Sequence, residues 1–224
     1  VALTYDVSDD AMVYASYSQG YRSGGFNGRV DDKVTAETPY NEEVVDNFEA
    51  GFKSTLLDNT LRLNGAVFVM KYKDKQEEIQ LPSLTSGTGQ VTLVANASTA
   101  TIKGIELDAQ FVPMAGLSIR ANLGLLKTEY DTFVFDGGMG LVDYSHLDFR
   151  RSPKVSANLG ANYEWDIGEG VATVGGSWHL MGAYETDFFN EAWLSNDSAQ
   201  NLVDANIGYS INNVQINLYA RNIF

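Results

Sequence analysis

The amino-acid sequence predicts an all-β fold, an antiparallel transmembrane β-barrel built as a meander. Two patterns support this: turn lengths alternate between short and long, and the segments between turns alternate apolar and polar residues. Short turns are expected at residues 8–10, 57–59, 113–115, 167–169 and 211–213. Long polar loops are expected at 22–41, 81–98, 132–152 and 187–201. All short turns therefore fall at one end of the meander, and all long loops fall at the other.

About ten strands follow from the period-two pattern. They are expected at residues 1–6, 11–21, 44–56, 61–79, 99–111, 117–131, 153–166, 171–186, 202–210 and 214–223. Residues 154–166 show the pattern well, with Val155, Ala157 and Leu159 alternating with Ser156 and Asn158. Several strands exceed the ~9–11 residues that cross a bilayer, and the excess is expected to project on the long-loop side. No helix or second domain is expected.

Aromatic residues on the apolar faces gather next to the short turns. In a membrane barrel this is the place of an interfacial aromatic girdle, whereas in a soluble β-sandwich the same residues would be core. The repetition at several strand ends favours the girdle. Its expected members are Tyr5, Phe111, Tyr163, Trp165 and Tyr209.

Composition excludes several classes of protein. The chain of 224 residues has 29 acidic and 15 basic residues, a net charge of −14, which makes nucleic acid a poor partner. It has no Cys, and therefore neither a disulfide nor a thiolate metal site. No apolar run approaches the ~20 residues of a transmembrane helix. Acidic residues in the long loops are expected to form a solvated surface, or alternatively to attract cationic ligands.

A series of short motifs covers nearly the whole chain. They are YASYSQGYRSGGFN at residues 14–27, NFEAGFK at 47–53, AVF at 66–68, YKDKQ at 72–76, KGIEL at 103–107, SPK at 152–154 and NLYARNIF at 217–224. In this order they resemble the barrel region of TonB-dependent outer-membrane receptors. Each motif alone is weak, and the ordered series carries the resemblance.

The resemblance implies the fold and the function. It implies a 22-stranded, plugged barrel, of which residues 1–224 form a partial barrel domain, truncated at both ends and without the plug. It also implies a receptor in the outer membrane of a Gram-negative bacterium, working in TonB-energised uptake of a scarce large nutrient, most often a ferric siderophore. The implied partners are outer-membrane lipid, the TonB complex through the plug segment, and a metal chelate. No enzyme activity, catalytic residue, resident metal or cofactor is expected.

Candidate ligand contacts are loop residues and polar-face residues at the long-loop ends of the strands. Arg pairs anionic groups in a bidentate manner, and aromatic rings stack on flat or apolar ligands. The candidates are Tyr21, Arg22, Phe26, Arg29, Tyr130, Tyr144, His146, Arg150, Arg151 and Tyr184.

Several alternatives remain open at the level of sequence. Ser177 with His179 could serve an outer-membrane hydrolase, and Glu106 with Asp108 could serve a glycosidase. A third set, Asp143, Tyr144 and His146, could ligate iron. At the level of the whole chain, the alternatives are a small passive porin closed by these ten strands, a surface adhesin with acidic binding loops, and a soluble β-sandwich.

Overall fold

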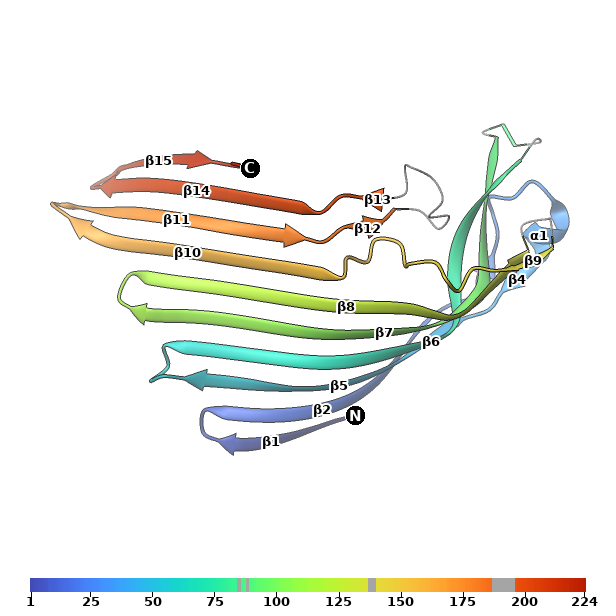
Figure 1. Ribbon diagram of the computed structural model, residues 1–224, viewed down its shortest axis with the longest axis horizontal. Helices are drawn as coiled ribbons and strands as arrows, with labels where there is room; N and C mark the ends of the chain where they lie inside the picture. The colour runs from blue at the N-terminus through green and yellow to red at the C-terminus, as the bar shows by residue number, and fades with distance from the viewer. Residues whose placement is uncertain (84–85, 88, 137–139, 187–195) are drawn as a thin grey trace.

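The computed structural model describes residues 1–83, 86–87, 89–136, 140–186 and 196–224. Ten strands form one antiparallel sheet in chain order, and β9 (Leu141–Asp143) pairs beside the sixth of them. The tight turns lie together at one end of the sheet and the long connections at the other (Figure 1). The predicted meander and its alternating turn lengths are therefore confirmed in these residues.

The strands of the main sheet match the predicted order. They are β1 (Ala2–Ser8), β2 (Ala11–Arg22), β5 (Glu43–Leu56), β6 (Leu61–Pro82), β7 (Gln90–Met114), β8 (Leu117–Asp136), β10 (Val155–Ile167), β11 (Gly170–Met181), β14 (Gln200–Ile211) and β15 (Val214–Ala220). Two small two-stranded sheets pair β3 (Gly25–Phe26) with β4 (Pro39–Tyr40), and β12 (Tyr184–Glu185) with β13 (Asn196–Asp197).

Three expectations about the long-loop end were wrong. Residues 90–98, expected in a loop, belong to β7, because β6 and β7 continue their pairing out to Pro82 and Gln90. The expected loop at 132–152 contains the end of β8 and β9. A helix, α1 (Lys33–Glu37), also forms where none was expected, and the Asp32 side chain caps it by accepting from the Thr35 amide. Residues 187–195 of the fourth expected loop lie outside the described residues.

Cross-strand register places the apolar residues on one face of the sheet. Leu107, Leu123 and Ala157 are consecutive partners across β7, β8 and β10. On the opposite face, the adjoining row contains Asp108, Asn122, Asn158 and His179. A hollow of about 510 Å³ on this polar face is lined by residues that include Arg120, Asn162, Asp204 and Arg221.

The apolar face is exposed. Leu159 is 46% exposed, Ile207 55% and Ile216 61%, and in the described residues no second sheet packs against them. A soluble sandwich would bury this face between two sheets, so that alternative is wrong. The ten strands also leave β1 and β15 at opposite edges of the sheet, unpaired with each other (Figure 1), which contradicts a small porin closed by these strands alone. Within the described ranges, no helix is long and apolar enough to cross a membrane.

The five expected girdle aromatics all lie on the apolar face near the tight turns. Tyr163 and Trp165 stack with ring centres 5.2 Å apart. The Tyr209 hydroxyl donates to the Ile167 carbonyl at 3.2 Å, while Tyr5 pairs with Val13 and Phe111 with Leu61. Their position fits a membrane interface, and that role stays a prediction.

Candidate ligand-binding site

The long-loop ends of β6, β7 and β8 carry the buried part of the molecule. Register shifts at Lys75 and a left-handed Asp74 (φ 51°) interrupt the pairing of β6 with β7. Such a bulge bends a strand and re-aims its side chains. Beyond it, Gln76, Glu77 and Ile79 are all buried.

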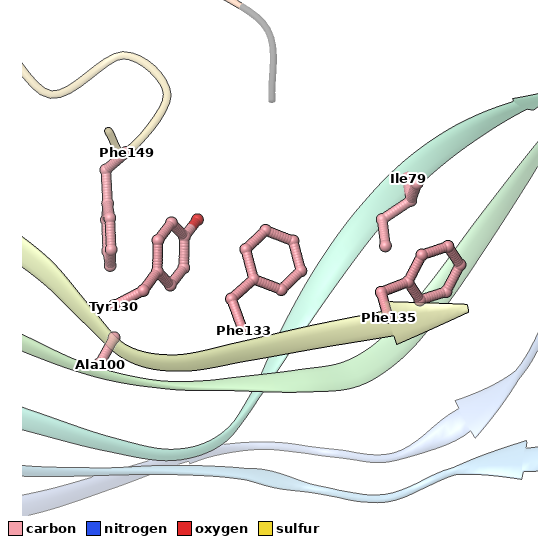
Figure 2. Packing of buried hydrophobic residues seen from close by; sticks show 6 residues of the cluster. All are labelled: Ile79, Ala100, Tyr130, Phe133, Phe135 and Phe149. Atoms are coloured by element: carbon pink, nitrogen blue, oxygen red, sulfur yellow. The ribbon is translucent and has the colours of Figure 1, made fainter. Parts of the chain in front are cut away.

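Aromatic side chains form a buried cluster in this region. The Tyr130 ring centre lies 4.2 Å from that of Phe149 and 4.8 Å from that of Phe133. Ile79, Ala100 and Phe135 complete the buried cluster, with Ile79 beside Phe135 in Figure 2. Phe149 comes from the connection between β9 and β10 and faces Tyr130 across the space between them (Figure 2). The cluster therefore holds a long connection against the sheet.

Hydrogen bonds fix the start of the same connection. The Tyr144 amide donates to the Phe133 carbonyl at 2.6 Å, and the Phe133 amide donates to Ser145 Oγ at 2.7 Å. Asp143 Oδ1 accepts from the Ser145 amide at 2.9 Å and from its hydroxyl at 2.6 Å. Donation by Ser145, first from the hydroxyl and then from the amide, holds the pKa of Asp143 below its ordinary value.

A buried ion pair lies beside this aromatic cluster. Lys75 Nζ pairs with Glu77 Oε1, and their side chains are 17% and 3% exposed. Ser98 Oγ donates to the same carboxylate oxygen at 3.3 Å. Lys75 Nζ also lies 5.1 Å from the Phe149 ring centre and 5.8 Å from that of Tyr130, within cation–π range. Burial first, and the Glu77 charge second, raise the pKa of Tyr130, which stays a neutral phenol at physiological pH.

These residues line a cavity of about 390 Å³ at the long-loop end. Its lining residues are Lys75, Glu77, Glu78, Gln80, Tyr130, Phe149, Arg150 and Arg151. Glu77 is paired with Lys75, and Glu78 is paired with Arg29 at 3.6 Å. Arg150 and Arg151 add two guanidinium groups to the lining. Guanidinium groups beside aromatic walls suit a planar anionic ligand.

The structure brings together some of the predicted ligand contacts and separates the others. Tyr130, Arg150 and Arg151 line the cavity. Arg29 forms an ion pair with Glu78, which is a lining residue, and Tyr144 packs against the aromatic cluster. Outside it lie Tyr21 and Arg22 at the end of β2, Phe26 in β3, the exposed His146, and Tyr184, whose hydroxyl donates to Asp197.

Sequence reasoning missed Lys75, Glu77 and Phe149. Phe149 directly precedes Arg150 and Arg151, so its neighbours could have drawn attention to it. Lys75 and Glu77 read as ordinary charges of a strand, because the bulge that buries them has no clear sequence signal.

The connection between β2 and β5 is fastened to the same strands. Asn27 Nδ2 donates to the Val94 carbonyl at 3.0 Å, and Asn27 Oδ1 accepts from the Val94 backbone amide at 2.7 Å. The Gln76 side-chain Nε2 donates to the carbonyls of Ser23 and Asn41, each at 3.0 Å. These bonds fasten the β2–β5 connection to β6 and β7, next to the cavity-lining residues Lys75 and Glu77.

The alternative chemistries find little support. His179 Nδ1 lies 2.6 Å from Asn158 Oδ1, and no hydrogen bond joins it to Ser177 within the described chain. The Asp108 carboxylate accepts from the amides of Asn64 and Asn122. Over the described ranges, no three His, Asp or Glu side chains converge on a possible metal position. The alternative iron set is divided, because Asp143 bonds Ser145 while the Tyr144 ring lies against Phe133.

Together, the single-sheet meander, its exposed apolar face and the polar face with a cavity at the long-loop end define a segment of a transmembrane β-barrel. A family model described as TonB dependent receptor-like, beta-barrel, matches residues 1–223. The chain belongs to this family of outer-membrane barrels.

Individual relatives agree with the family. The pesticin receptor of Yersinia pestis is 30% identical over 126 residues, which are 56% of this chain and 17% of that protein. The ferric yersiniabactin uptake receptor FyuA of Yersinia pestis superposes with a TM-score of 0.77 at 23% identity, covering 99% of this chain and 31% of FyuA. BauA, the ferric preacinetobactin receptor of Acinetobacter baumannii, gives 0.72 at 18% identity, with 99% and 31% covered. The chain thus spans under a third of the length of these relatives.

Proposed function

We propose that this chain is part of an outer-membrane receptor that takes up a ferric siderophore or a similar chelate, energised through TonB. Membership of the receptor family, together with the cavity at the long-loop end, carries the proposal. In this assignment the chain is a single partial barrel domain. Lipid covers the apolar face, and the plug and TonB-contacting segment belong to the rest of the receptor.

The cavity chemistry supports an anionic chelate as the ligand. Arg150 and Arg151 supply charge-assisted hydrogen bonds to carboxylate, hydroxamate or catecholate oxygens. Tyr130 and Phe149 supply rings against which a flat ligand can stack. The receptor acts by binding and transport, without catalysis and without a resident cofactor.

Uptake of iron-55 chelates by cells that carry the intact receptor tests the proposal. A strain lacking the receptor is compared with the complemented strain over a panel of ferric siderophores, with and without a protonophore. We expect receptor-dependent uptake of at least one anionic chelate, abolished by the protonophore. Uptake that is indifferent to the receptor for every chelate, or unaffected by the protonophore, would contradict the proposal.

A matched pair of variants tests the role of the cavity. Arg151→Gln removes one guanidinium of the lining, and we expect the chelate to bind about tenfold more weakly, in line with a charged hydrogen bond. Lys33→Gln makes the same change of charge in α1, outside the cavity lining, and is expected to leave affinity unchanged. Equal affinities for both variants would remove Arg151 from the binding site.

A further inference from the structure

Three lysines lie close together on the apolar face of the sheet. They stand at the long-loop end of its band of apolar residues, which is called the apolar band below. Lys103 of β7 and Lys127 of β8 are direct cross-strand partners, and Val69 is the partner of Lys103 on its other side. Directly below them, the same face carries Val67, Ile105 and Leu125 as consecutive partners. Lys71 lies on this face two residues beyond Val69 (β6, β7 and β8 in Figure 1).

The position of these lysines matches the depth of a membrane surface. Lys127 lies about eleven residues along β8 from its start at Leu117, where a strand crosses a bilayer in ~9–11 residues. The ammonium groups would therefore stand at headgroup level on the long-loop side. Aliphatic lysine stems can lie along the apolar band while their charges reach the polar layer.

Charge balance in this row is unfavourable without an additional anion. Like charges directly opposite each other across two strands are destabilising. In the part of the chain that the structure describes, neither Lys71 nor Lys103 has a carboxylate within ion-pair distance, and Lys103 interacts with Glu129 only at longer range. Lys127 pairs with Glu129 at 2.7 Å, but its side chain is 67% exposed, and such exposed pairs contribute little.

The acids on this face stand farther from the apolar band. Asp46 and Glu129 belong to the row of Lys71, two residues beyond the row of Lys103, and Asp46 is held by Lys73 at 3.0 Å. The row of Lys103 itself contains Tyr17, Phe48, Val69 and Lys127, with no acid. Positive charge thus lies nearest to the lipid in a chain whose net charge is −14.

We propose that Lys103 and Lys127, assisted by Lys71, bind the phosphate-bearing headgroup of a lipid in the leaflet on the long-loop side. The occupant is a membrane lipid, because the row adjoins the apolar band and a headgroup anchored by its acyl chains is presented at this height. This assignment rests on the membrane placement of the proposed function, and it concerns a surface separate from the ligand cavity.

The test uses the intact receptor in phosphatidylcholine nanodiscs to which lipid A, a phosphorylated glycolipid, is added. Native mass spectrometry measures retained lipid A. We expect the double variant Lys103→Gln/Lys127→Gln to bind it about twentyfold more weakly, at about fivefold per lysine near an anionic surface. The double variant Lys33→Gln/Lys53→Gln makes the same charge change away from this row, because Lys33 lies in α1 and Lys53 lies near the tight turns, and it should bind as the parent does.

Two further arms separate charge from folding and lipid from free anion. The double variant Lys103→Arg/Lys127→Arg keeps both charges and should retain lipid A, whereas loss equal to that of the Gln variant would overturn the charge-based assignment. Inorganic phosphate at the same total phosphate concentration should leave lipid A bound, and displacement by it would overturn the lipid assignment. Equal binding by the two Gln double variants would also overturn it. Bound lipid A is measured in the absence of any chelate, so this test is independent of transport. A receptor that retains lipid A but takes up no chelate would contradict only the proposed transport function.

Discussion

The ring of Phe149 lies 4.2 Å, centre to centre, from the ring of Tyr130, although the two residues come from different segments of the chain. Tyr130 belongs to β8, and Phe149 belongs to the connection that leads to β10. Through this contact, the connection carrying Arg150 and Arg151 is packed against the sheet. Packing of the aromatic cluster thereby determines where the two guanidinium groups of the cavity stand.

Replacing Phe149 with Ala should release this connection. Phe→Ala at a buried site costs about 3–5 kcal/mol, and here the loss falls on a local cluster. We expect faster hydrogen exchange at residues 144–151 and weaker chelate binding, with the barrel still folded. Phe149→Leu keeps most of the apolar volume and should exchange more slowly than the Ala variant. Unchanged exchange in Phe149→Ala would show that the hydrogen bonds at Ser145 are sufficient.

The Lys75–Glu77 pair should show strong coupling between its two residues. Removing one partner of a buried pair leaves an uncompensated charge and costs about 3–5 kcal/mol, whereas replacing both by apolar residues is often near neutral. We therefore expect Glu77→Leu to lower the midpoint of urea unfolding more than Lys75→Met/Glu77→Leu does. Additive effects in this double-mutant cycle would contradict the pairing.

Acid should loosen the start of the β9–β10 connection. The folded-state pKa of Asp143 is below its ordinary value of 3.8, so ionised Asp143 stabilises the folded loop. This stabilisation is present above that ordinary value and is lost as the pH falls through the lower folded pKa. Hydrogen exchange at the Ser145 amide, corrected for intrinsic rates, should accelerate below about pH 4. In Asp143→Asn the protection should be low and independent of pH over this range.

The tight turn between β7 and β8 should reject a side chain. Gly116 has φ +81°, and a Cβ there would overlap the carbonyl oxygen of Glu164. Gly168 also has a positive φ of +62°, but a Cβ there would meet open space. Gly116→Ala should therefore lower the yield of folded intact barrel clearly more than Gly168→Ala, whose expected cost is the roughly 1 kcal/mol of the left-handed conformation. Gel mobility of unheated samples measures the yield.

A charge in the middle of the apolar band should identify the lipid-facing side. Leu123 lies about midway along the part of β8 that would cross the bilayer. We expect Leu123→Arg to reduce the stability of the intact barrel in vesicles by about 2–4 kcal/mol. Asn122→Arg places the same charge on the opposite face beside Asp108 and should be mild. Similar losses for both variants would contradict the assignment of faces.

Much of the fold was predictable from local patterns. The predicted tight turns and strand order agree with the structure. So does the predicted face of the sheet for each side chain in residues 154–166. Period-two alternation and turn residues are local properties, which is why they could be predicted. The far ends of β6 to β8 were missed. Their pairing continues through residues 90–98, which were assigned to a loop although Val91, Leu93, Ala95 and Ala97 recur with a period of two.

The candidate site was predictable only in part. Arg150, Arg151 and Tyr130 were selected as residue types suited to a ligand, and they meet in one cavity. Tyr21, Phe26 and Tyr184 were selected on the same grounds and lie elsewhere. The type of residue alone does not distinguish the candidates that line the cavity from those that lie elsewhere. Which loops come together is decided by packing between segments that are far apart in the sequence.

Local sequence patterns were enough to establish the fold class, the face that carries the apolar residues and the end that carries the long loops. These follow from side-chain periodicity and turn chemistry, which act over a few residues. Tertiary structure alone decided that the β6 bulge buries Lys75 and Glu77, that Phe149 packs on Tyr130, and that Lys103 meets Lys127 across two strands. Each of these depends on strand register and on contacts between distant segments, which the free energy of the whole sheet selects.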